Sequence, residues 1–313
     1  MDRALPSALC DLAAAQLGVF CSRQAHGYGI SDQDLSRLAR KGRVVRLGQG
    51  AYAEPRALDG LDATARYVMT VRAVVLARSV PSWASHHAAL ALFGIPLVDA
   101  DMGCVDVAAR VVAPFRSQHV RVSSLPDDEP CTSVNGTPSV SVTTAVVQVA
   151  ARSLKAGLVA ADASVHTGQT TMEQLAMRAD QLPFGPRQRR TLVAVLGAVD
   201  PGAESPGESL ARLVLKGLGL PVRSQVVLRD LDGVIGRVDF VVDERVVVEF
   251  DGLVKYAGAG GRDALAREKR REDRLRAAGY EVVRLTWADL RQPERLGAAI
   301  RAAQDRARAR TVA

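Results

Sequence analysis

The chain has 313 residues and a formal net charge of +7, and only 4% of its residues are aromatic. This length exceeds one ordinary domain, so two or three compact units are expected, and the scarcity of aromatic side chains argues against nucleic-acid binding by base stacking. Four widely spaced cysteines without a Cys-x-x-Cys pair indicate neither a zinc site nor a disulfide framework. No apolar stretch reaches the ~18 residues of a membrane-spanning helix, so a cytoplasmic chain without a membrane partner is expected.

The first 58 residues show the pattern of a winged helix-turn-helix domain. Ser31 is a good N-cap for the third helix and Gly42 a good stop. A glycine-tipped hairpin follows as the wing. The predicted helices and the wing span residues 7–17, 22–27, 32–41 and 44–53.

The third of these helices has the character of a DNA-recognition helix. Leu35, Leu38 and Ala39 fall on one face, which predicts that this face is buried. The opposite face is polar and basic, as expected for a helix that enters the major groove. The candidate contacts to double-stranded DNA are Gln33, Arg37, Arg40 and Lys41 of the helix and Arg43, Arg46 and Gln49 of the wing. The alternative is a unit used only for packing or protein contacts, and DNA binding is favoured over it.

Residues 59–200 predict a middle domain of mixed α/β character without a catalytic motif. Helices are expected over 64–78 and 82–93, short strands between 103 and 122, and a hairpin turn at Asn135-Gly136. Four further helices are expected over 143–152, 155–167, 171–179 and 186–199. His86 and His87 are adjacent and would point about 100° apart on a helix, so a structural role is expected rather than a shared metal.

The third predicted domain, 201–313, begins after a run of turn-forming residues. Ser205, Pro206 and Glu208 form the start of a helix in which Ser205 and Glu208 make a capping box. Glu208 either serves this cap alone or also approaches the acidic hairpin described next. Both roles are compatible.

The stretch 237–255 predicts a β-hairpin with an acidic centre. A three-residue bend at 243–245 would place Asp239 opposite Glu249 and Val241 opposite Val247. A two-residue bend would send Glu249 to the other side. The three-residue bend is favoured because it makes one face wholly apolar. The side chains of that face are Val238, Phe240, Val242, Val246, Val248 and Phe250.

The same register gathers Asp239, Glu249 and Asp251 on the second face of the hairpin. Clustered carboxylates repel one another unless a cation is present, and hard oxygen ligands suit Mg²⁺ or Mn²⁺. The competing interpretation is a surface hairpin whose acids pair with nearby arginines. The stretch 262–310 carries most of the net positive charge and supplies candidate phosphate-binding residues. These are Arg262, Arg270, Arg271 and Arg274.

The order helix, three strands, helix, strand in residues 205–287 resembles the restriction-endonuclease-like fold. The resemblance is greatest to the domains similar to very-short-patch-repair endonucleases, and it is carried by Glu208, by Asp239 in RVDF, by the EFDG segment 249–252 and by the tail 268–287. It implies that Asp239, Glu249 and Asp251 bind the metal and that Glu208 assists. Asp251 stands where the usual pattern has a lysine, so Lys255 or Lys269 would take the catalytic role of that lysine.

The first 200 residues resemble the AbiEi-type antitoxin family. The resemblance is carried by three segments, RVVRLGQGAYAEP at 43–55, SHHAALALFGIPL at 85–97 and VTTAVVQVAARSLKAGLVAADASVHTG at 142–168. It implies a winged-helix repressor of its own operon and a cognate toxin as protein partner.

The sequence therefore predicts an α+β multidomain protein that combines a winged helix, a mixed α/β middle domain and a restriction-endonuclease-like core. The first functional hypothesis is a Mg²⁺-dependent endonuclease that nicks or cleaves DNA. The alternative is a non-enzymatic, antitoxin-like transcriptional repressor with a degenerate nuclease fold. A third hypothesis is a structural adaptor in which every acid is paired.

Overall fold

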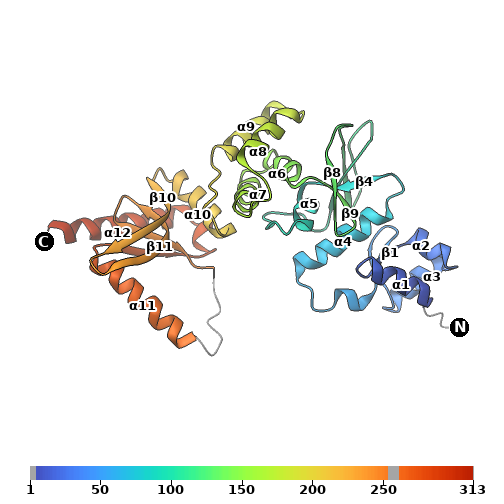
Figure 1. The fold of residues 1–313 in the computed structure, drawn as a ribbon, viewed down its shortest axis with the longest axis horizontal. Coiled ribbons are helices and arrows are strands. Elements are labelled where there is room, and N and C mark those ends of the chain that lie inside the picture. Colours follow the sequence, from blue (N-terminus) through green and yellow to red (C-terminus); the bar gives the residue numbers. More distant parts are fainter. Residues whose placement is uncertain (1–4, 253–260, 313) are drawn as a thin grey trace. The chain divides into compact units, whose positions relative to one another are not determined.

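The computed structural model describes residues 5–252 and 261–312 (Figure 1). The chain divides into two compact units, Met1–Leu196 and Gly197–Ala313. Both contain helices and sheets, which confirms the α+β class at this level, and the further boundary at residue 58 stays a prediction. Lys255 lies outside the described residues, as does the side chain of Arg262. No helix in the described parts of the chain is both long and apolar enough to cross a membrane.

The helices and the hairpin predicted for the winged helix are present at the start of the first unit. The helices are α1 (Ser7–Ala15), α2 (Ser22–Gly27) and α3 (Asp32–Arg40). Strands β2 (Val45–Gly48) and β3 (Ala51–Ala53) form the wing, and β1 (Val19–Cys21) completes a sheet of order β1-β3-β2. Strand β1 was not predicted, because three residues are too few to show a strand period. The first helix ends earlier than predicted because Leu17 and Gly18 turn the chain with φ of 60° and 86°.

A small core holds this domain together. Leu9, Phe20, Ile30 and Leu35 are each 0% exposed and lie in one cluster. Phe20 stacks on Tyr52 with ring centroids 5.7 Å apart, which joins β1 to β3. The inward positions predicted for α3 are confirmed, since Leu35 and Leu38 are buried and Ala39 packs against the same cluster.

The rest of the first unit is built on a six-stranded sheet of order β6-β7-β5-β4-β9-β8. Its strands are β4 (Ser82–Ala84), β5 (Val105–Ala109), β6 (Phe115–Arg116), β7 (Val120–Ser124), β8 (Cys131–Val134) and β9 (Thr137–Val140). The hairpin turn at Asn135-Gly136 is confirmed, with φ of 47° and 78° at the two residues. The helices of this part are α4 (Ala63–Ala77), α5 (His86–Leu92), α6 (Val142–Ala150), α7 (Leu154–His166), α8 (Met172–Gln181) and α9 (Pro186–Leu196).

One element of this region differs from the prediction. The single helix expected over 82–93 is a strand, β4, followed by the shorter helix α5. Residues 82–84 pair with β5 on one side, and Ala84 pairs with Ser139 of β9 on the other. Three residues are too few to show a period in the sequence, so only these long-range partners decide their conformation.

The second unit has the predicted order of helix, three strands, helix and strand. Its elements are α10 (Pro206–Gly217), β10 (Val222–Asp230), β11 (Gly233–Val242), β12 (Val246–Phe250), α11 (Gly261–Ala277), β13 (Glu281–Leu285) and α12 (Pro293–Val312). The strands form a sheet of order β10-β11-β12-β13, in which β12 and β13 run parallel. The fold-family assignment stays a prediction.

The predicted register of the acidic hairpin is confirmed. Phe240 pairs with Val248, Val241 with Val247 and Val242 with Val246. The bend at 243–245 has three residues, and Asp243 and Glu244 adopt positive φ of 49° and 62°. The choice of the longer bend over the two-residue bend was therefore correct.

Helices cover both faces of this sheet (Figure 1). Phe240 and Val248 pack with Leu215 of α10 and Ile300 of α12. Val241 and Val247 pack with Leu275 of α11 in a second core, so the face opposite Phe240 and Val248 is covered rather than open.

The prediction was wrong for Val238, which lies in the core with Val241 and not with Phe240. The ladder between β10 and β11 is not regular on either side of Val238: Gln225, between the pairs Ser224–Phe240 and Val226–Val238, has a φ of 51°, and the register shifts between Leu228 and Arg229. A local irregularity of this kind breaks the strict alternation on which the prediction relied.

Gly207 provides a test of packing in this unit. A Cβ at Gly207 would overlap the ring of Phe250, which itself packs edge-on against Trp287 at 5.0 Å. We expect Gly207→Ala to lower the free energy of unfolding by roughly 1–3 kcal/mol because it overpacks this site. Gly217→Ala in the same helix meets nothing within 4 Å and should raise stability by up to about 1 kcal/mol through helix propensity. Chemical denaturation of both variants checks this, and equal stability of the two would contradict the packing role of Gly207.

Candidate functional site

The start of α3 is held in place by a complete capping box. The Ser31 hydroxyl accepts the Asp34 N–H at 3.1 Å, and the Asp34 carboxylate accepts the Ser31 N–H at 3.2 Å. His26 of α2 contacts Asp32 of α3 at 3.0 Å, which links the two helices of the turn. These contacts set the position from which the side chains of α3 project.

Every predicted DNA contact of the winged helix is exposed. The exposed residues are Gln33, Arg37, Arg40, Lys41, Arg43, Arg46 and Gln49. Arg37 pairs with Asp34 at 3.4 Å, and Arg46 donates to the Gly48 carbonyl at 3.3 Å. Exposed contacts of this kind contribute little to stability, so these side chains can exchange them for phosphates or base edges.

Asp239 is the centre of the predicted acidic site in the second unit. The Phe250 N–H donates to its carboxylate at 2.8 Å. The pKa of Asp239 is raised to about 6, chiefly by burial and also by the negative charges of Glu208 and Glu249, while the Phe250 N–H and the positive charge of Arg271 act to lower it. Two of the predicted acids, Glu208 and Glu249, therefore lie within electrostatic reach of Asp239.

Glu208 lies at the start of α10, where its N–H donates to the capping Ser205 hydroxyl at 3.2 Å, and it also lies beside Asp239. Its carboxylate accepts the Ser205 hydroxyl at 2.7 Å and the Glu204 N–H at 3.0 Å. Gln225 of β10 donates to it at 2.8 Å. Both oxygens of this buried side chain are therefore already engaged by protein donors.

Arg271 of α11 supplies the cation that faces Glu249. Its guanidinium donates to the Glu249 carboxylate, donates to the Arg237 carbonyl at 3.0 Å and pairs with Glu268 at 3.3 Å. A Cβ at Gly236 would come within 2.9 Å of its Nε, so the absence of a side chain there makes room for it. This pair between Glu249 and Arg271 is what the competing interpretation of the hairpin predicts, in which the acids are paired with nearby arginines.

Asp251 follows β12 directly, and its N–H donates to the Leu285 carbonyl at 2.7 Å. Within 5–252 and 261–312, no group of three His, Cys, Asp or Glu side chains has the arrangement of a metal site. The described arrangement therefore does not fit a divalent cation held by Asp239, Glu249 and Asp251. Metal binding by these residues stays a prediction.

The remaining predicted residues of this site lie away from Asp239 or are engaged elsewhere. Lys269 is exposed and sits two positions before Arg271, which places it about 200° around α11. Arg270 is exposed. Arg274 binds the Asp230 carboxylate through two nitrogens at 2.9 and 2.6 Å. Phosphate binding by these arginines stays a prediction, and for Arg271 and Arg274 it would require loss of an ion pair.

The approach of Arg271 to the acids was not predicted, although the sequence carries a signal for it. Leu275 is the buried leucine of α11, and Arg271 lies four residues before it, on the same face of the helix. Because Leu275 faces the sheet, Arg271 on the same helix face also points toward the sheet and its acids.

Comparison with known families bears on the winged helix. Residues 7–55 match the family model described as "Transcriptional regulator, AbiEi antitoxin". The match is to that domain, and it supports a DNA-binding regulator. No curated protein matches the chain.

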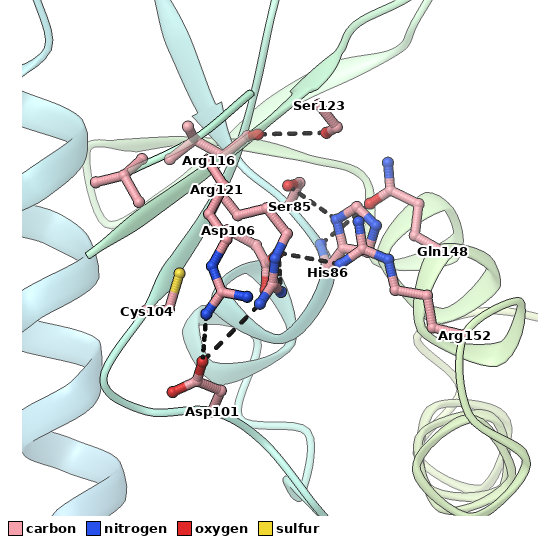
Figure 2. Close-up of polar contacts among 12 residues, drawn as sticks. Ser85, His86, Asp101, Cys104, Asp106, Arg116, Arg121, Ser123, Gln148 and Arg152 are labelled. Carbon is pink, nitrogen blue, oxygen red and sulfur yellow. Dashed lines mark hydrogen bonds and ion pairs between the residues drawn. The ribbon is translucent and has the colours of Figure 1, made fainter. Parts of the chain in front are cut away.

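A buried ion cluster outside both predicted sites was also missed (Figure 2). Asp106 of β5 is 3% exposed, and it accepts hydrogen bonds from Arg121 of β7 at 2.8 Å and from Arg152, after α6, at 3.1 Å. Arg121 and Arg116 also face Asp101, at 3.9 and 3.5 Å. A single Asp within an apolar strand was the sequence signal for a buried, paired charge.

His86 borders this cluster, and its surroundings agree with the structural role expected for it (Figure 2). Its N–H donates to Gln148 at 3.0 Å, and its Nδ1 lies 3.1 Å from the Ser85 hydroxyl. Burial holds the pKa of His86 well below its usual value, and the positive charge of Arg152 acts in the same direction. The imidazole is therefore neutral at neutral pH.

The raised pKa of Asp239 predicts a stability effect that depends on pH. Because its pKa is about 6 in the folded chain and 3.8 ordinarily, its charged form opposes folding. Its contribution to stability is most favourable below pH 3.8 and is lost as the pH rises through 6. Asp239→Asn, which stays neutral, should raise the free energy of unfolding at pH 8 by roughly 1 kcal/mol, discounted for partial exposure.

This gain should shrink toward zero as the pH falls to 4. Denaturation of the wild type and the Asp239→Asn variant at several pH values measures it. A difference of constant size from pH 4 to pH 8 would show that the charge on Asp239 does not oppose folding.

Proposed function

We propose that the chain is a DNA-binding transcriptional regulator of the antitoxin kind. The observation that carries the proposal is the exposed basic face of α3, which lies within the segment that matches the regulator family. The capping box at Ser31 and the core around Leu35 hold this helix in a defined orientation. The net charge of +7 favours a polyanionic partner.

In this proposal α3 enters the major groove of double-stranded DNA. Gln33 lies near its N-terminal end, and Arg37 and Arg40 follow on the exposed face. Glutamine can read adenine and arginine can read guanine through paired hydrogen bonds. Arg43 and Arg46 contact phosphates, and these contacts position the helix without specifying sequence.

A cognate toxin is the proposed protein partner, by analogy with the description of the matching family. An antitoxin that represses transcription would bind DNA upstream of its own gene. That region is therefore the DNA to test first.

Replacing Arg37 and Arg40 by Ala should weaken binding to this DNA by roughly 1–3 kcal/mol for each arginine that reads a base. Fluorescence anisotropy at two salt concentrations measures the effect, and the affinity of the wild type should fall steeply as salt rises. Arg66→Ala, an exposed change in α4, serves as the matched control and should leave affinity unchanged. Equal affinity of the Arg37→Ala, Arg40→Ala and Arg66→Ala variants contradicts the proposed surface.

The second candidate function is a Mg²⁺-dependent endonuclease activity of the second unit. It is favoured by one observation, the approach of Glu208 and Glu249 to Asp239 in the predicted register. The arrangement of these acids does not fit Mg²⁺, because Glu249 accepts a hydrogen bond from Arg271 and Glu208 accepts hydrogen bonds from three protein donors. This candidate therefore requires a rearrangement of α11.

Nicking of supercoiled plasmid in Mg²⁺ or Mn²⁺ tests the second candidate. The wild type should nick the plasmid, and the Asp239→Ala and Glu249→Gln variants should not. Both variants should retain DNA binding by the winged helix. Nicking that persists in both variants, or is absent from the wild type, rules out this assignment.

A further inference from the structure

A groove in the first unit lies against the wing and is separate from the exposed face of α3. Its volume is about 900 Å³. Its walls are Ser22 at the start of α2, the wing residues 46–50, the end of α4 with the two residues that follow, and residues 117–120, which run from the end of β6 to the first residue of β7. A pocket of this size falls within the range of small-molecule sites.

Close backbone packing holds the wing wall of the groove. A Cβ at Gly48 would come within 2.9 Å of Val74 in α4, and one at Gly50 within 3.0 Å of the Ser22 hydroxyl. Gly50 also has a φ of 66°, and its carbonyl accepts the Ser22 N–H at 2.9 Å. The groove is therefore largely preformed and does not depend on closure of a free wing.

The polar lining of the groove suits an anion. Arg46, Arg78 and His119 line it from three separate segments, and Ser and Gln residues also belong to its lining. Arg78 is oriented by its Nε, which donates to Ser82 at 3.4 Å, and its guanidinium lies 6.0 Å from the Phe115 ring centroid. None of the described residues that line the groove is Asp or Glu. Two guanidinium groups with neighbouring hydroxyls favour phosphate, because phosphate oxygens accept several charge-assisted hydrogen bonds.

The remaining lining is apolar. Leu47, Val74, Ala77 and Val120 contribute aliphatic surface beside the cationic side chains. A bare inorganic anion would leave this surface uncovered. A molecule with a phosphate at one end and a flat, weakly polar group at the other would use both parts of the groove.

We propose that this groove binds a small phosphate-bearing molecule of nucleotide size. Its phosphates contact Arg46, Arg78 and His119, and its base lies against Leu47 and Val74. Arg46 belongs both to the groove and to the proposed DNA contacts of the wing. The ligand therefore competes for Arg46 and weakens DNA binding, a consequence that rests on the proposed regulator function.

Calorimetric titration of the full chain with ATP, without DNA, tests the ligand site. The wild type should bind ATP more tightly than inorganic phosphate, and Arg78→Ala and His119→Ala should each weaken ATP binding at least about tenfold. Arg116→Ala is the matched control, since Arg116 is in the neighbouring strand but faces Asp101 (Figure 2). Circular dichroism confirms that each variant is folded. Absence of ATP binding, or equal affinity in the Arg78→Ala variant and the wild type, overturns the proposal.

Measuring DNA binding by the same variants distinguishes a nucleotide site from a surface that contacts DNA. The distinction is needed because the DNA backbone carries the same phosphate chemistry. Arg78→Ala and His119→Ala should bind DNA as the wild type does when ATP is absent. If ATP does not bind and Arg78→Ala weakens DNA binding as Arg37→Ala does, the groove follows the DNA backbone and the ligand proposal fails. If ATP binds as expected and the wild type binds no DNA, the ligand site stands and the regulator function fails.

Discussion

The need to pair buried charge is the constraint on which both units depend. In the second unit, α11 packs on the sheet through Leu275, and Arg271 of that helix meets Glu249. In the first unit, Asp106 lies inside the sheet region and receives two arginines. Removing one partner of a buried pair costs about 3–5 kcal/mol, because the other charge is left without compensation. These contacts therefore tie strands and helices to one another.

The contrast between buried and exposed charge also separates the two candidate functions. The basic side chains of α3 and the wing are exposed, and the pair between Arg37 and Asp34 is weak in water. They can meet a polyanion without loss of protein stability. Arg271 is three-quarters buried, with 23% of its side chain exposed, and it holds both Glu249 and Glu268. A cation at Glu249 would have to replace a guanidinium that is already well placed, so the regulator is the function that the arrangement supports better.

Features with a local cause were predictable from the sequence. The Ser31 cap, the buried positions Leu35 and Leu38, and the Asn135-Gly136 turn depend on residues a few positions apart. The hairpin register was predictable because only a three-residue bend pairs apolar positions with apolar positions. Strand β4 was not predictable, since its three residues adopt their conformation only beside β5 and β9.

The sequence by itself determined that an acidic hairpin forms, which residues face one another across it, and that a capped basic helix precedes a wing. The tertiary structure alone decided what the acids meet. Glu249 and Arg271 are 22 positions apart and come together only because Leu275 packs α11 onto the sheet. Residue type and spacing reveal a concentration of carboxylates, but the identity of their counter-charge depends on how a separate helix is packed against them.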